Sequence, residues 1–68
     1  MLKLKTSIRV LRAMHNMTQE ELAKKVDVSR QTIVYLEKGE FSPSFALVWK
    51  IATLFNKKIE DIFTYENE

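Results

Sequence analysis

Two helix-start signals, eleven residues apart, constrain the fold of this chain more than any other feature. The first is the pair Thr18 and Glu21, which has the T-x-x-E spacing of a capping box. The second is Ser29, whose hydroxyl can accept a hydrogen bond from a free N–H group of a first helical turn. Only one short helix fits between them, and we predict it over residues 19–26. Its inward positions are Leu22, Ala23 and Val26.

The helix that follows Ser29 has an end as well as a start. Gly39 stands where a left-handed residue without a Cβ closes a helix easily. Asp27 and Val28 leave room only for a tight turn before Ser29. The sequence therefore predicts a second helix over 30–38, directly behind the first.

The helix 30–38 has an inner and an outer side when its residues are placed at about 100° each. The inner side carries Ile33, Leu36 and Glu37, and the outer side carries Gln31, Tyr35 and Lys38, flanked by Arg30, Thr32 and Val34. A solvated helix face is usually filled with Glu, Lys and Ala. An amide, a phenol and an ammonium group on one side indicate instead a surface that binds a partner.

The rest of the chain predicts three more helices and a small ribbon. The helices are expected over 7–15, 45–55 and 59–62. The first of them follows the spacing of Ile8, Leu11 and Met14, with Val10 beside them. Apolar and polar residues alternate at the two ends, 2–5 and 63–66, as in strands, and we expect an antiparallel pair; frayed ends are the alternative.

Length and composition limit the classes of function. Sixty-eight residues make one domain, 1–68, whose core rarely supplies more than about 3 to 5 kcal/mol. Cysteine is absent and histidine occurs once, so we expect no disulfide, no metal and no cofactor. Neither a Ser/His/acid set nor a glycine-rich phosphate loop is present, which makes an enzyme the least supported class. Without a leader or a run of ~20 apolar residues, we expect a cytoplasmic domain that contacts no membrane.

Charge is unevenly distributed along the chain. The net charge is only +2, yet residues 1–16 carry four bases and no acid, whereas 59–68 carry four acids and no base. A basic body with an acidic end is compatible with a polyanionic partner.

Two short helices, the second with a reactive outer face, form a helix-turn-helix at 18–38. The stretch TQEELAKKVDVSRQTIVYLEKG, followed by SPS and IEDIF, resembles the lambda-repressor-like (Xre-type) DNA-binding family over almost the whole chain. The resemblance implies an all-α, five-helix domain, and the paired ends are similar to those of the short stand-alone regulators of this family. Asp27 replaces the usual turn glycine, which Asp can do in a left-handed conformation.

The resemblance also implies which residues contact double-stranded DNA. The groove-facing, base-reading positions are Arg30, Gln31, Thr32, Val34 and Tyr35, and the sugar-phosphate contacts are Gln19, Ser29, Lys38, Phe41, Ser42 and Ser44. Arg12 and Glu37 match the family's buried ion pair between the first and third helices. The chemistry agrees, because Arg matches guanine and Gln matches adenine bidentately in the major groove. We therefore expect a sequence-specific transcriptional regulator, a repressor.

Apolar residues exceed what one small core needs. The helix 45–55 is apolar nearly all round, and we expect Phe45 and Trp49 in it to be packing residues. A homodimer on a palindromic operator would cover the surplus through region 49–65. Its expected contacts are Trp49, Leu54, Ile59, Ile62 and Phe63. The alternative is an antitoxin-like or adaptor module that uses the same fold to bind a protein.

Overall fold

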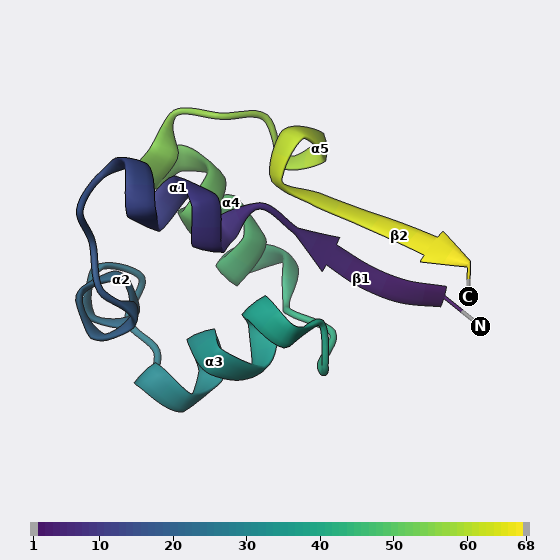
Figure 1. The fold of residues 1–68 in the computed structure, drawn as a ribbon, viewed down its shortest axis with the longest axis horizontal. Helices are drawn as coiled ribbons and strands as arrows, with labels where there is room; N and C mark the ends of the chain where they lie inside the picture. Colours follow the sequence, from purple (N-terminus) through teal and green to yellow (C-terminus); the bar gives the residue numbers. More distant parts are fainter. Residues whose placement is uncertain (1, 68) are drawn as a thin grey trace.

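The computed structural model describes residues 2–67 as five helices closed by a two-stranded sheet (Figure 1). Met1 and Glu68, the ends of the expected domain, lie outside the described residues. In chain order the elements are β1 (Leu2–Thr6), α1 (Ile8–Met14), α2 (Gln19–Lys25), α3 (Arg30–Lys38), α4 (Phe45–Phe55), α5 (Ile59–Ile62) and β2 (Phe63–Asn67). The expected five-helix fold with a terminal ribbon is confirmed.

The two ends of the chain form an antiparallel ribbon that extends from the helical body (Figure 1). Its register pairs Leu4 with Tyr65 and Thr6 with Phe63. The Ser7 N–H donates to the Ile62 carbonyl at 3.0 Å, which continues the ladder to the start of α1. Strands so short are marginal in isolation. This pair is stabilised because Leu4 and Phe63 are buried among the helices.

The predicted helix starts use their side chains as caps. The Glu21 N–H donates to the Thr18 hydroxyl at 3.0 Å, and the Thr18 N–H donates to Glu21 Oε1 at 2.9 Å, which completes the capping box. The bond from the Thr18 backbone is the main reason that the pKa of Glu21 lies below its usual value. Ser29 caps α3 and Ser44 caps α4, each by accepting from the N–H three residues later.

Turns between the helices depend on left-handed residues. Asn16 and Asp27 have φ of 52° and 61°, and Gly39 ends α3 with φ of 73°. Gly39 also lies against the carbonyl oxygen of Leu4, so a Cβ at this position would clash with the backbone of β1. Glycine is therefore required here by conformation and by close approach of two chain segments.

A single core lies between the helices and one face of the ribbon. Its fully buried large side chains come from every helix of the body from α1 to α4: Ile8, Leu22, Ile33, Leu36, Ile51 and, at the end of α2, Val26. Of the apolar positions whose spacing predicts the first helix, Ile8 and Leu11 are buried, whereas Met14 and the neighbouring Val10 are exposed. α1 ends at Met14, and Met17, beyond the turn, packs against the core in its place.

The C-terminal half corrects several expectations about apolar residues. Ile62 and Phe63 are only 2% and 9% exposed, so they belong to the core of the single chain and are not surplus apolar surface. Ile59 is half-buried and packs on that core. Conversely, Phe45 and Trp49, expected as packing residues, are 73% and 54% exposed. Among residues 2–67, no helix is both long and apolar enough to cross a bilayer.

Candidate nucleic-acid interface

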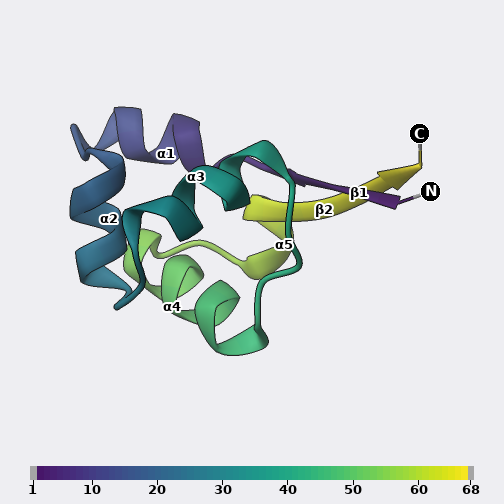
Figure 2. The same ribbon diagram turned by 90° about the horizontal axis from the view of Figure 1, so that it is seen from below.

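Helices α2 and α3 pack against each other, and α3 lies on the outside of the molecule (Figure 2). Its inner side is fixed by the buried Ile33 and Leu36. Its outer side exposes a guanidinium, an amide, a phenol and an ammonium group, those of Arg30, Gln31, Tyr35 and Lys38. An α-helix with such an exposed face has the width that a major groove accepts.

Two of the five expected base-reading residues are less accessible to a ligand than the others. Val34 is half-buried at the edge of the surface. Thr32 is half-buried too, and its hydroxyl lies 3.0 Å from that of Ser29 in the cap of α3. Of the polar groups, Arg30, Gln31 and Tyr35 are therefore the most available to a ligand.

The ion pair expected between Arg12 and Glu37 is present and joins α1 to α3. Arg12 Nε donates to Glu37 Oε2 at 2.6 Å and Nη2 donates to Oε1 at 3.1 Å. Nη1 donates to the Met17 carbonyl at 3.0 Å, so all three nitrogens of the guanidinium are used. The two side chains are 14% and 8% exposed. Bidentate geometry and low exposure make this pair a rigid brace rather than a surface contact.

Gln19, at the start of α2, belongs to the same network. Its side-chain Nε2 donates to Glu37 Oε1 at 3.0 Å. Because a carboxylate only accepts, this bond determines which way the amide of Gln19 is turned. Nε2 has a second hydrogen, which remains available to a phosphate oxygen. Glu37 thus positions both Arg12 and Gln19.

An open hollow of about 520 Å³ lies where α1, α2 and α3 meet. We call it the basic hollow; it is lined by Arg9, Arg12, Thr18, Gln19, Val34, Glu37 and Lys38. Glu37 is neutralised by Arg12, whereas Arg9 and Lys38 are exposed. The hollow therefore offers positive charge and N–H donors to an anion.

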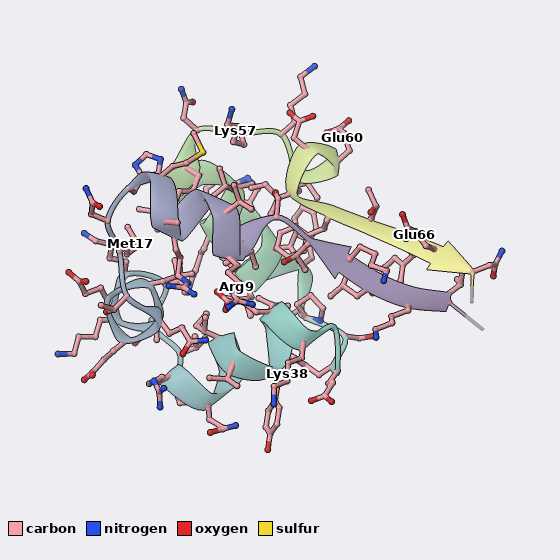
Figure 3. All side chains as sticks on the ribbon, in the orientation of Figure 1. Arg9, Met17, Lys38, Lys57, Glu60 and Glu66 are labelled. Carbon is pink, nitrogen blue, oxygen red and sulfur yellow. The ribbon has the colours of Figure 1, made fainter. Side chains whose placement is uncertain are left out.

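Arg9 is the residue that sequence reasoning missed. In the sequence Arg9 contributes to the basic N-terminal charge, and its position gives no reason to connect it with the helix 30–38. In Figure 3 it lies between α1 and α3. The signal that could have found it is the spacing to Arg12: three residues later on the same helix face, Arg12 reaches α3.

The other residues expected to contact the sugar-phosphate backbone differ in how accessible their polar groups are. The hydroxyls of Ser29 and Ser44 accept the capping bonds of α3 and α4. Phe41 is half-buried and packs on the core, while Ser42 is exposed. Lys38 and Ser42 are thus the exposed members of this set whose polar groups are not used in a helix cap, whereas Gln19 is half-buried.

Comparison with known proteins finds matches over the same segments. A helix-turn-helix family model matches residues 8–62. An uncharacterised HTH-type transcriptional regulator of Archaeoglobus fulgidus is 58% identical over 65 residues, which cover 96% of this chain and 92% of the relative. One of the same description from Bacillus subtilis is 42% identical, covering 96% of this chain and 98% of the relative.

Solved structures agree in architecture. The crystal structure of the transcriptional regulator VanUg superposes with a TM-score of 0.80 at 25% sequence identity. The match covers 98% of this chain and 89% of VanUg, and therefore includes the ribbon as well as the helices.

Proposed function

This chain belongs to the Xre-type helix-turn-helix family, and from this we propose that it is a sequence-specific DNA-binding transcriptional regulator, which acts in the cytoplasm as a repressor. The observation that carries the proposal is the outer face of α3. Its exposed Arg30 and Gln31 stand on a helix braced from behind by the Arg12–Glu37 pair. Reading bases needs such side chains on a rigid element.

Base reading is assigned to the outer face. Arg30 would donate to O6 and N7 of a guanine, and Gln31 would pair with N6 and N7 of an adenine. Tyr35 would contact a phosphate or the methyl group of a thymine. Val34 and Thr32 would add apolar contact at the groove wall.

Sugar-phosphate contacts are assigned to the residues around the basic hollow and after α3. Gln19 would donate its free amide hydrogen, while Lys38 and Arg9 would supply charge. Ser42 is exposed and can donate its hydroxyl, and Phe41 would contribute its backbone N–H because its ring packs on the core. Ser29 and Ser44 would remain near the backbone, chiefly as helix caps. Such contacts set register and salt dependence but carry no sequence information.

The operator is proposed to be palindromic and to bind a homodimer. One α3 helix contacts only a few base pairs, and phosphate contacts alone give dissociation constants of ~10⁻⁴ to 10⁻⁶ M at physiological salt. Two copies with their α3 helices about 34 Å apart would read successive major grooves, with half-sites about 10 bp apart.

The test is selection of DNA fragments by the full chain, followed by titration of three variants. Arg30→Ala and Gln31→Ala should weaken the selected site by about 1 to 3 kcal/mol each and random DNA much less. Lys38→Ala should weaken both DNAs alike and lower the salt slope by about one unit. Equal losses on selected and random DNA for Arg30→Ala would remove the base-reading role, and failure to enrich any fragment would overturn the function.

A further inference from the structure

A groove between the ribbon and α4 is an apolar feature of the surface away from the outer face of α3. It has a volume of about 320 Å³ and is lined by Leu4, Pro43, Phe45, Val48, Ile59, Phe63 and Tyr65. We call it the apolar groove. None of these lining side chains carries a charge, and the base of the groove is formed by the buried Leu4 and Phe63.

Large aromatic side chains stand exposed around this groove. Phe45 is 73% exposed and Tyr65 is 53% exposed at its rim. Trp49 follows Phe45 by four residues on α4, so it stands about one turn further along the same side of the helix, 54% exposed. The patch thus has a hollow and, beside it, a protruding indole.

From this juxtaposition we infer that the apolar groove is the dimerisation surface, occupied by a second copy of this chain whose Trp49 enters the groove. A twofold contact uses the same patch on both copies, so the patch must carry both the protrusion and its receptor. The inference rests on the proposed homodimer and names its interface. Of the contacts expected from the sequence it keeps Trp49 as the anchor, with Ile59 and Phe63 in the lining of the groove. It adds Phe45 and Tyr65 and leaves out Leu54 and the buried Ile62.

The position of the groove suits two copies on one DNA. In Figure 2 α3 lies toward the viewer, whereas α4 and α5 lie to one side of it. A twofold axis along that line of sight, passing beside α4, leaves both α3 helices on the same face of the dimer. Contact through α1, or through the outer face of α3 itself, would instead use or hide surfaces near the DNA.

The available apolar area indicates a weak dimer. The exposed parts of three aromatic side chains from each of two copies amount to on the order of 600 Å², since such side chains bury 150–250 Å² each. Stable interfaces bury about 1,200 Å² or more. We therefore expect a dissociation constant in the micromolar range, with DNA shifting the equilibrium toward the dimer.

The experiment uses the full chain and its one tryptophan. Sedimentation equilibrium from one to a hundred micromolar should show the mass rising toward twice that of the chain. Over the same range the emission of Trp49 should move to shorter wavelength as its indole leaves water. A mass that stays at one chain with emission independent of concentration overturns the inference.

Matched variants locate the contact. Trp49→Glu should raise the dimer dissociation constant about 30-fold, as for a buried aromatic anchor. Leu54→Glu is the control, because Leu54 lies on the same helix but about 140° away from Trp49. Phe45→Glu, at the most exposed rim position, should act like Trp49→Glu; each variant is checked by circular dichroism for an unchanged helical spectrum. A Trp49→Glu protein that dimerises as the parent does places the interface elsewhere.

These readouts do not involve DNA, so they separate the inference from the proposed function. If the chain selects DNA fragments but stays monomeric free and bound, the groove assignment fails and DNA binding stands. If it dimerises through Trp49 but selects no DNA, the interface stands and the regulator function fails.

Discussion

The basic hollow and the apolar groove differ in what each needs from a binding partner. The basic hollow has its charges organised within the chain, because Glu37 holds Arg12 and Gln19 by three hydrogen bonds of 2.6 to 3.1 Å. The aromatic side chains at the rim of the apolar groove, Phe45 and Tyr65, are not covered by other parts of the chain and remain exposed to water. A preformed polar site pays no ordering cost when an anion arrives, whereas an uncovered apolar site gains free energy only when something covers it.

If both proposals hold, one small domain combines two kinds of recognition that respond differently to salt. Electrostatic contacts around Arg9 and Lys38 weaken with salt, because DNA binding releases counterions. Apolar contacts around Trp49 depend much less on salt. We therefore expect ionic strength to separate the two activities: high salt should dissociate DNA while leaving the dimer intact.

The largest effect is expected on stability, from replacing Glu37, which holds Arg12 and Gln19 at the basic hollow. Glu37→Ala should destabilise the fold by about 3 to 5 kcal/mol, because it strands Arg12 at 14% exposure. For a chain of this size that approaches the whole free energy of unfolding. Urea denaturation followed by circular dichroism measures it.

Two controls sharpen this prediction. Phe45→Ala, at the rim of the apolar groove, should change stability by no more than about 0.5 kcal/mol in the monomer, as at other exposed positions. Replacing both partners, Arg12→Met with Glu37→Leu, should recover much of the loss. A Glu37→Ala protein that melts within a degree or two of the parent would show that the brace is dispensable.

A smaller effect, on DNA binding rather than on stability, is expected from Arg9, which lines the basic hollow but is not part of the Arg12–Glu37 pair. Arg9→Ala should leave the fold and the dimer unchanged but weaken binding to all DNA, with the salt slope reduced by about 0.9. Lys24→Ala, which removes an exposed charge outside the hollow, is the matched control. A slope that is the same for Arg9→Ala and the parent would exclude Arg9 from the interface.

The smallest effect concerns the capping box at the edge of the basic hollow. The pKa of Glu21 is lowered in the fold, so its ionised form contributes stability above the usual carboxyl range and loses it as pH falls through the lowered pKa. Glu21→Gln should therefore be less stable than the parent near neutral pH, and the difference should shrink in acid.

Urea denaturation at several pH values between neutrality and pH ~3 tests this. Glu20→Gln removes the same charge one residue away and outside the capping box, and serves as control. A stability difference between Glu21→Gln and the parent that does not change with pH would contradict the role of the ionised carboxylate.

Sequence reasoning succeeded where local chemistry decides structure. Thr18, Ser29 and Ser44 satisfy helix N–H groups within three residues, and Gly39 takes a left-handed conformation, so the helix boundaries could be predicted from short segments. The ion pair between Arg12 and Glu37 was predicted from the family resemblance rather than from the spacing of the residues. The helix caps and the ion pair were both predictable because the type of each residue specifies the kind of group that it binds.

Prediction was less successful where burial depends on the assembled core. Ile62 and Phe63 look like surplus apolar residues in the sequence, but the ribbon carries Phe63 beside Leu4 and both become core. Met14 and Trp49 fit helical spacing equally well and remain exposed. Helical periodicity predicts on which side of a helix a residue lies. Burial also requires that another element packs against that side at the same position along the helix. Arg9 was missed for the same reason, since its neighbour is α3.

The pairing of β1 with β2 has a consequence for the order in which the chain matures during translation. The residues of the basic hollow, from Arg9 to Lys38, have all been synthesised before α4 emerges. The apolar groove needs Leu4 and Tyr65, which are joined only when the last strand reaches the first. Closing so long a loop is slow compared with packing α2 on its neighbour α3. A nascent chain would therefore acquire the surface proposed to contact DNA first and the surface proposed for self-association last, so that dimerisation would be restricted to chains whose synthesis has passed β2.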